Sequence, residues 1–198
     1  LLFEQGISEE DIKTMVVHVD NTPPVTTVSA GNPKYSTADK QYVSATTPIT
    51  LSANDPDVAG VSSGVSSTQY KVDSGNYGNY TGAFTLSEGI HTVTFKSTDN
   101  VGNTELATQN SQLFYVDATP PDAQISVGAP QCAENGKIIV SALTQFTLTA
   151  SDPEVSGGAS GVKETRFRLN GGAWQTYASA FTLQGQAQDG EVKIEFYG

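Results

Sequence analysis

An internal repeat constrains this chain more than any other feature of its sequence. When the sequence is shifted by 97 residues, 29 of the 67 positions between residues 20 and 86 carry the same residue as their counterpart. The Asp-x-Thr-Pro-Pro motif at residues 20–24 falls on the same motif at residues 117–121. Such self-similarity predicts two copies of one folding unit. The 198 residues leave room for two units of about 100 residues each.

Apolar residues recur at every second position within each copy. Ile49, Leu51 and Ala53 alternate with polar residues, and so do Val93 and Phe95 further along the chain. Matching alternations occur at residues 69–72, 146–151 and 166–169. A period of two is typical of strands that bury one face. We therefore predict about six or seven short strands in each copy, packed as two sheets.

Glycine and proline mark the turns and the domain boundaries. The chain contains 19 Gly and 9 Pro residues, which favours many turns over long helices. Paired prolines hold the backbone extended and lack amide donors, so we expect short, semi-rigid linkers at the Thr-Pro-Pro motifs. These features predict an all-β chain with two tandem immunoglobulin-like (Ig-like) β-sandwich domains, domain 1 at residues 21–117 and domain 2 at residues 118–198.

Residues 1–20 precede the first copy. The apolar segment 15–19 runs into an Asp-x-Thr-Pro-Pro motif just as segment 113–116 does. Since segment 113–116 is predicted to be the final strand of domain 1, residues 14–20 are predicted to be an extra N-terminal strand, the last strand of a preceding or neighbouring domain. Before it, a serine followed by acidic residues predicts a short helix at residues 8–14, with a loop as the alternative.

The two ends of the chain raise a further hypothesis. Allowing for a four-residue insertion after Leu183 in the second copy, Gly198 aligns with Ser97, so domain 2 is expected to lack its final strand. One explanation is that the chain is a fragment of a longer array. The other is that Met15, Val17 and Val19 form a donor strand that completes domain 2 of an identical subunit by strand addition. Such head-to-tail contacts do not close and would build a filament.

Two stretches of the first copy resemble bacterial Ig-like repeats. They are residues 66–75 (Ser-Ser-Thr-Gln-Tyr-Lys-Val-Asp-Ser-Gly) and residues 88–103, which end in Asp-Asn-Val-Gly-Asn, with Tyr80 and residues 84–86 between them. Such repeats occur in tandem in secreted and surface-anchored prokaryotic proteins, including adhesins and modular polysaccharide-degrading enzymes. The resemblance covers residues 14–198. It implies an extracellular or cell-surface location and a role as a spacer, stalk or adhesive module.

The charge of the chain excludes several classes of partner. The formal net charge is −11, and nucleic acid and anionic membranes both require a basic surface. The sequence has no apolar run of about 18 residues, so we expect no membrane insertion. A single cysteine, Cys132, cannot form an internal disulfide, and we expect a small buried thiol at this position.

The sequence carries no recognisable catalytic motif, and we predict that the chain is not an enzyme. It has two histidines, His18 and His91, and the second shares the parity of the apolar residues in its predicted strand. We interpret His91 as a half-buried packing residue. Asp55 and Asp57 form a carboxylate pair, but their Asn-Asp-Pro-Asp setting favours a turn or ion-binding role over glycosidase chemistry.

Calcium is the ion that the sequence favours. Asp99, Asn100, Asn103 and Glu105 occupy one predicted turn, and Asp117 ends the strand that follows. Carboxylate and amide oxygens of this kind are the ligands that Ca²⁺ takes in proteins. In adhesin repeats that this chain resembles, acidic residues in these places hold Ca²⁺ and stiffen the rod. Ordinary Asx turns are the alternative explanation.

Aromatic residues raise the question of carbohydrate binding. Tyr77 and Trp174 are equivalent in the two copies, and each is followed three residues later by a tyrosine, Tyr80 or Tyr177. Exposed rings of this kind stack well on sugars. Because both copies keep the pattern, packing of these rings on the sandwich is the interpretation we favour.

Together these features predict a non-catalytic, extracellular structural, spacer or adhesive module. The alternative is an accessory, carbohydrate-binding module of a secreted polysaccharide-degrading enzyme. Neighbouring Ig-like domains or identical subunits are the expected partners, with a glycan or a cell-surface ligand as a further candidate. Calcium is the only cofactor for which the sequence offers ligands.

Overall fold

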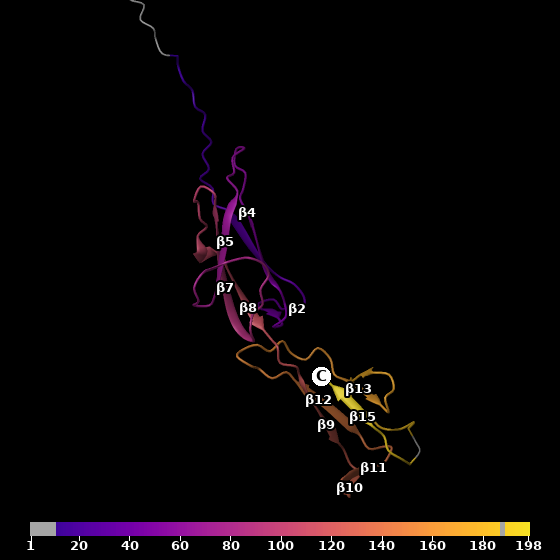
Figure 1. Cartoon of the computed structure of the whole chain (residues 1–198). Helices are drawn as coiled ribbons and strands as arrows, with labels where there is room; N and C mark the ends of the chain where they lie inside the picture. Colours follow the sequence, from indigo (N-terminus) through magenta and orange to yellow (C-terminus); the bar gives the residue numbers. More distant parts are fainter. Residues whose placement is uncertain (1–10, 187–188) are drawn as a thin grey trace, which may run out of the picture.

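The computed structural model describes residues 11–186 and 189–198, and this part of the chain consists of β-strands, loops and a short 3₁₀ helix, Ala107–Gln109 (Figure 1). The predicted all-β architecture is thereby confirmed. Within residues 11–186 and 189–198 the structure contains no helix whose length and hydrophobicity would let it span a membrane. Repeat 1 (residues 21–117) contains β1 (Val25–Ala30), β2 (Lys34–Ser36), β3 (Gln41–Val43), β4 (Ile49–Asn54), β5 (Val65–Val72), β6 (Gly78–Asn79), β7 (Gly89–Asp99) and β8 (Ser111–Val116).

The repeat in the sequence is also a repeat in the structure. Repeat 2 (residues 118–198) contains β9 (Asp122–Val127), β10 (Gln131–Glu134), β11 (Lys137–Val140), β12 (Phe146–Ser151), β13 (Arg166–Leu169), β14 (Gln175–Thr176) and β15 (Ile194–Tyr197). Strands β9, β12 and β14 start and end 97 residues after β1, β4 and β6. The same local sequence therefore directs the same strand in both halves of the chain.

Two sheets pack against each other in repeat 1. Strands β1 and β4 pair antiparallel, with Val28 opposite Leu51. The other sheet has six strands in the order β2-β3-β8-β7-β5-β6. Buried side chains of both sheets share one core, made of Ala30, Val43, Ile49, Leu51, Leu86, Val93, Phe95, Phe114 and Val116. Positions predicted to be apolar and inward-facing, such as Ile49 and Val93, are indeed buried.

Repeat 2 keeps part of this arrangement. Strand β9 pairs with β12, and β13 lies between β14 and β15. A stacked ring pair occurs at the same place in each repeat: the centroids of Phe167 and Phe181 lie 4.1 Å apart, as do those of Tyr70 and Phe84. One difference is that β3 runs parallel to β8 in repeat 1, whereas the β10–β11 hairpin pairs with no further strand in the described part of repeat 2.

Cys132 corrects one expectation. The thiol was predicted to be buried, but Cys132 lies in β10 and is exposed. All four residues of β10 are exposed, as are all three of the equivalent strand β2, which lies at the edge of its sheet in repeat 1. The equivalent Tyr35 in β2 of repeat 1 is also largely exposed, at 55%.

The segment before repeat 1 also departs from expectation. Residues 11–20 form neither helix nor strand, and Figure 1 shows them leading away from repeat 1. The predicted helix at 8–14 is therefore not formed over residues 11–14, and residues 8–10 lie outside the described residues. Met15, Val17 and Val19 are 84%, 62% and 67% exposed. A strand needs a neighbouring strand to pair with, and residues 11–20 belong to no sheet in the described part of the chain.

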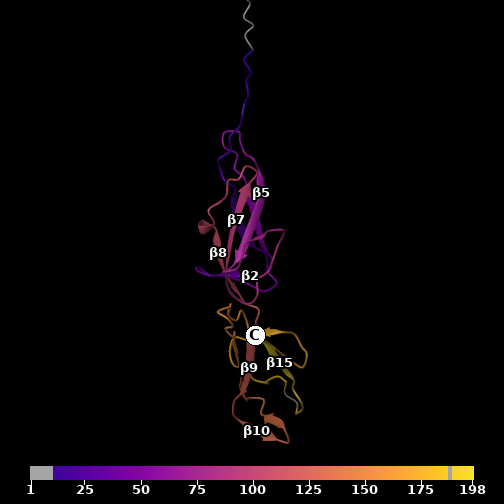
Figure 2. The same cartoon turned by 60° about the vertical axis from the view of Figure 1, so that its left-hand side comes forward.

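The two repeats lie end to end, as the rotated view in Figure 2 also shows. A loop of repeat 2 meets the end of repeat 1 at their joint. A Cβ atom added to Gly158 would lie 2.1 Å from the carbonyl oxygen of Val116, and one added to Gly157 would lie 2.6 Å from Ile90. Only glycine allows the backbones to approach this closely.

A buried threonine organises the same loop in each repeat. Thr47 is fully buried, and its hydroxyl donates to the carbonyl oxygen of Pro33 and accepts from the N–H of Ser44 at 2.9 Å. Thr144, equally buried, bonds Pro130 and Ser141 in the same way. One hydroxyl thus satisfies two backbone groups of the loop.

We expect Thr47→Val to destabilise repeat 1 by about 1–3 kcal/mol, because the isosteric side chain leaves a buried carbonyl and a backbone N–H without partners. Thermal or urea unfolding followed by circular dichroism measures this change. Thr46→Val is the matched control, because Thr46 is exposed and its loss is expected to cost less than about 0.5 kcal/mol. Equal stability of the Thr47→Val and Thr46→Val variants would contradict the structural role of Thr47.

Candidate metal centre

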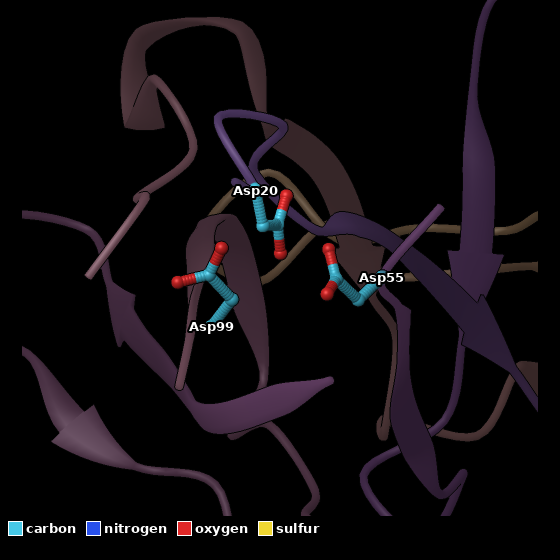
Figure 3. A group of neighbouring side chains, drawn as sticks. All are labelled: Asp20, Asp55 and Asp99. Carbon is cyan, nitrogen blue, oxygen red and sulfur yellow. The ribbon is translucent and has the colours of Figure 1, made fainter. Parts of the chain in front are cut away.

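Three aspartates converge at the end of repeat 1 where the chain enters it. Asp20 precedes the first Thr-Pro-Pro motif, Asp55 follows β4, and Asp99 ends β7. One carboxylate oxygen of each lies within 4.8 Å of one from each of the others. Figure 3 shows the three carboxylates turned toward one another. Residues far apart in the sequence thus form one acidic group.

A tight turn holds Asp99 in place. Its Oδ1 accepts hydrogen bonds from the N–H groups of Val101 (3.0 Å) and Asn103 (2.8 Å), and its Oδ2 accepts from Nδ2 of Asn103 at 2.6 Å. Gly102 adopts a φ of 98° in this turn. The amide of Asn103 also donates to the main-chain oxygen of Asp20 at 3.1 Å. The Asp-Asn-Val-Gly-Asn motif therefore joins the β7 turn to the incoming linker.

Backbone N–H groups of residues 63 and 64 hold the other two carboxylates. Oδ2 of Asp20 accepts from the N–H of Ser63 at 2.8 Å. Oδ2 of Asp55 accepts from the N–H of Gly64 at 2.7 Å and from the hydroxyl of Ser62 at 2.9 Å. A short loop thus binds one oxygen of each aspartate and leaves the other oxygens for different partners.

Oδ1 of Asp55 has no hydrogen-bond partner, although it is buried. It is among the few buried side-chain oxygens in the described residues that no donor reaches. The equivalent atom of repeat 2, Oδ1 of Asp152, is also buried and without a partner. Buried carboxylate oxygens normally accept hydrogen bonds, so the same exception at equivalent positions calls for a physical explanation.

Two of these carboxylates have lowered pKa values. Hydrogen bonds from Ser63 and from the backbone of Thr22 hold the pKa of Asp20 below its ordinary value. Burial alone would raise the pKa of Asp99, but hydrogen bonds from the side chain and backbone of Asn103 outweigh it, and the pKa is lowered. Both groups are therefore ionised at neutral pH, and the cluster carries concentrated negative charge.

The cluster overlaps only in part with the calcium ligands predicted from the sequence. Asp99 belongs to it, and Asn103 bonds two of its members. The amide of Asn100 instead donates to the carbonyl oxygen of Ser63 at 2.7 Å. Asp117 belongs to the linker into repeat 2, where its Oδ2 accepts from the N–H of Ser160 at 2.8 Å. The predicted set is thus not brought together as one site.

Sequence reasoning missed Asp20 and Asp55 as members of this group. The signal that identifies them is the repeat, since both aspartates recur as Asp117 and Asp152. The second pair also makes the same bonds, from Ser160 to Asp117 at 2.8 Å and from Gly161 to Asp152 at 2.6 Å. Positions kept identical in two copies that otherwise differ are good candidates for structural or binding roles.

Glu105 uses its carboxylate to close the edge of repeat 1. Its oxygens accept from the N–H of Thr26 (2.7 Å), the N–H of Ser97 (2.6 Å) and Nδ2 of Asn110 (3.1 Å), and also from the hydroxyl of Thr26. These donors come from β1, β7 and the segment before β8. Because both of its carboxylate oxygens already accept hydrogen bonds from the protein, Glu105 links these three segments to one another.

The four predicted glycan-platform residues fall into two pairs. Tyr80 lies edge-on to Phe84, with centroids 6.5 Å apart, and Tyr177 lies edge-on to Phe167 at the same distance. These tyrosines pack against the ring pairs of their own repeats. The packing interpretation therefore fits Tyr80 and Tyr177.

Tyr77 and Trp174 lie on the surface and face cations. The ammonium groups of Lys71 and Lys96 lie 5.4 Å and 4.7 Å from the ring centroid of Tyr77. The guanidinium of Arg168 lies 4.6 Å from the ring centroid of Trp174, whose side chain remains 38% exposed. Of the four residues, Trp174 is the most exposed, and its ring is therefore the best placed to stack on a sugar.

His91 joins two turns at one end of repeat 1. Its Nδ1 lies 2.8 Å from Oδ2 of Asp73, and its Nε2 lies 3.0 Å from the carbonyl oxygen and 3.3 Å from the hydroxyl of Ser87. The residue types are those of a hydrolase triad. However, the shorter contact of Nε2 is to the carbonyl oxygen, which only accepts hydrogen bonds. This geometry therefore fits a structural link between the two turns better than a base that activates Ser87.

No protein-family model matches the chain, and no curated protein matches it.

The lowered pKa values predict a loss of stability in acid. A carboxylate whose pKa is lower in the folded than in the unfolded protein stabilises the fold above the unfolded value of about 3.9, and this contribution is lost as pH falls through the folded value. We expect Tm to change little between about pH 7 and 5 and to fall below about pH 4. Asp99→Asn should have a lower Tm at neutral pH and a smaller fall in acid, whereas Asp57→Asn should behave like the wild type. An unchanged acid dependence in Asp99→Asn would contradict this assignment.

A second variant tests whether Glu105 links protein segments or binds a metal ion. Glu105→Gln replaces one acceptor oxygen by a donor that faces N–H groups, and we expect it to destabilise the chain by about 1–3 kcal/mol. The loss should be the same with and without millimolar Ca²⁺ in thermal unfolding. A loss of stability that appears only in the presence of Ca²⁺ would show instead that Glu105 is a Ca²⁺ ligand.

Proposed function

We propose that this chain is a non-catalytic structural module of an extracellular or cell-surface protein. In this proposal two Ig-like domains in series act as a spacer that sets the distance between the parts of the protein, or of its partners, on either side. The observation that carries it is a linker that both repeats bind. The N–H of Asp117 donates to the carbonyl oxygen of Val43 in repeat 1 at 2.9 Å, while its carboxylate accepts from Ser160 in repeat 2.

Further contacts at the joint support a stiff connection. The hydroxyl of Thr119, in the linker, donates to the carboxylate of Glu88 in repeat 1. The two prolines that follow restrict the backbone further. Gly157 and Gly158 of repeat 2 pack against Ile90 and Val116 of repeat 1. A spacer needs a connection that keeps its direction, and a joint with hydrogen bonds to both repeats provides this better than a flexible linker.

The proposed location and partners rest on the resemblance of the repeats to bacterial Ig-like repeats. Neighbouring domains of the same kind, or identical subunits, are the natural partners of such a module. The exposed alternation of Met15, Val17 and Val19 is compatible with donation of a strand to a neighbouring subunit. In that case the spacer would extend into a filament.

A second candidate function is carbohydrate binding as an accessory module of a secreted polysaccharide-degrading enzyme. The observation that favours it is Trp174, a partly exposed indole with a cation over its ring. Tyr77 occupies the equivalent position in repeat 1 and is also flanked by cations. Repetition of the platform would allow two weak sites to act together.

Small-angle X-ray scattering of the whole chain tests the spacer proposal. The wild type should scatter as one elongated, rigid particle. Gly158→Ala should shorten the mean end-to-end distance, because a methyl group 2.1 Å from a carbonyl oxygen forces the joint apart and frees it to bend. Gly78→Ala is the matched control, since a Cβ at Gly78 meets nothing within 4 Å.

Two outcomes would overturn the proposal. Wild-type scattering from two independently moving halves would contradict a stiff spacer. Binding of an oligosaccharide from a defined panel, lost in Trp174→Ala while the fold is kept, would favour the carbohydrate-binding function instead.

A further inference from the structure

The six-stranded sheet of repeat 1 has an outer face, turned away from the core, that is locally cationic. Lys96 follows the buried Phe95 on β7, and Lys71 follows Tyr70 on β5, whose ring packs against the core. Both lysines therefore leave the sheet on its outer face. Among the described residues, Asp99 is the only acidic residue in the strands of this sheet, and it is buried. The outer face is thus positive in a chain whose formal net charge is −11.

One tyrosine ring holds two of these cations together. The ammonium groups of Lys71 and Lys96 lie 5.4 Å and 4.7 Å from the ring centroid of Tyr77, above the paired strands β5 and β7 (Figure 1). Neither lysine forms an ion pair with a carboxylate in the part of the chain that the structure describes. The ring attracts both cations, but the two cations repel each other. An anion bound between them would remove that repulsion.

Repeat 2 carries such an anion in its own sequence. Lys71 pairs with Thr94 across β5 and β7, and the counterpart of Lys71, Arg168, pairs with Glu195 across β13 and β15. Glu195 accepts from Nε of Arg168 at 2.9 Å and from its Nη2 at 3.1 Å. Repeat 2 therefore has a carboxylate at the position where repeat 1 has a threonine. The same position in repeat 1 offers cations to a carboxylate from outside the chain.

A second cation–ring cluster lies on the outer face. The ammonium group of Lys40 lies 5.9 Å from the ring centroid of Tyr42 and 4.8 Å from that of Tyr115. Tyr115 lies between the buried Phe114 and Val116 on β8, so its ring points outward. Lys40 also has no carboxylate partner within the described residues. From the rise along a strand and the spacing between strands, the two clusters lie roughly 15 Å apart.

Hydroxyl groups lie between the two clusters. Thr92 and Thr94 alternate with the buried Val93 and Phe95 on β7, so they also face outward. Their hydroxyls make no hydrogen bond within the described part of the chain. A hydroxyl both donates and accepts, which suits the hydroxyls of a sugar. Separated cations, rings beside them and free hydroxyls between them fit a linear chain of acidic sugars better than a compact anion.

We propose that the outer face of repeat 1 binds an acidic polysaccharide, a linear chain of sugars that carry carboxylates. One carboxylate lies between Lys71 and Lys96 above Thr94, and another lies at Lys40. The negative charge elsewhere on the chain does not prevent this, because charges more than about 8 Å away are largely screened at physiological ionic strength. Repeat 2 does not bind this ligand at the equivalent position, because Glu195 already occupies the cation there.

This inference goes beyond the proposed spacer function and does not require it. It gives one repeat of the spacer a surface that attaches it to an acidic polymer. The scattering experiment measures the stiffness of the chain without any ligand, so the two ideas fail separately. The site also differs from the Trp174 surface, which belongs to repeat 2.

Isothermal titration of the whole chain with hexagalacturonate, which carries a carboxylate on each sugar, tests the proposal. Cellohexaose is the neutral control ligand, and hexaglutamate is the acidic peptide control. The variants are Lys71→Gln, Thr94→Glu and Glu195→Thr, each checked for folding by circular dichroism. Lys137→Gln and Ser52→Glu are the matched controls, because both positions are exposed and lie off the outer face, on β11 and β4.

The wild type should bind hexagalacturonate with a Kd below about 1 mM and should not bind cellohexaose. Lys71→Gln should raise Kd roughly fivefold, because a charge-assisted contact is lost. Thr94→Glu should raise it roughly tenfold, because its carboxylate takes the place of the ligand. Glu195→Thr should add a second binding site, and Lys137→Gln and Ser52→Glu should keep the wild-type Kd.

Salt dependence gives an independent readout. Binding should weaken as salt rises from about 0.1 M to about 1 M, since the Debye length falls from about 10 Å to about 3 Å. Binding that does not change over this range would contradict a site made of half-exposed lysines.

Several results would overturn the proposal. One is the absence of binding heat for the wild type at about 5 mM hexagalacturonate. Another is an equal Kd for Thr94→Glu and the wild type, or an equal loss of affinity in Ser52→Glu. Tighter binding of hexaglutamate than of hexagalacturonate would assign the outer face to an acidic peptide instead. Binding that survives Lys71→Gln and is lost in Trp174→Ala would move the site to repeat 2.

Discussion

The structure depends on how each repeat binds the linker that leads into it. A linker aspartate accepts a backbone N–H from the loop after the first sheet: Asp20 from Ser63 and Asp117 from Ser160, both at 2.8 Å. A charged acceptor makes such a bond stronger than one between neutral groups. The prolines after each aspartate then fix the direction of the chain. This bond and the prolines position each repeat relative to the segment that precedes it.

Local pattern predicted the strands well. Alternation over residues 49–53 placed Ile49 and Leu51 in the core, and the 97-residue shift located β9 and β12 from β1 and β4. The prediction from local pattern failed where the outcome depends on the neighbouring strands in the sheet. Strand β10, which carries Cys132, is exposed like the equivalent edge strand β2, and residues 14–20 pair with no strand of the described residues.

The carboxylate cluster could not be read from spacing along the chain. Asp20, Asp55 and Asp99 meet because β4 and β7 end at the same edge of the sandwich as the linker enters it. Sequence proximity grouped Asp99 with Glu105 instead, but the side chain of Glu105 points to donors on β1 and β7. The comparison of the two repeats, rather than the local motif, holds the information about such long-range groups.

The parallel pairing of β3 with β8 has a mechanical consequence. Strand β8 continues directly into the linker toward repeat 2, so a pulling force on that linker acts along β8. Its hydrogen bonds to β3 and β7 run across the direction of the force and are loaded together rather than opened one after another. Shear of this kind resists extension more than unzipping does, which makes β8 the element that carries tension from repeat 1 into the rest of the chain.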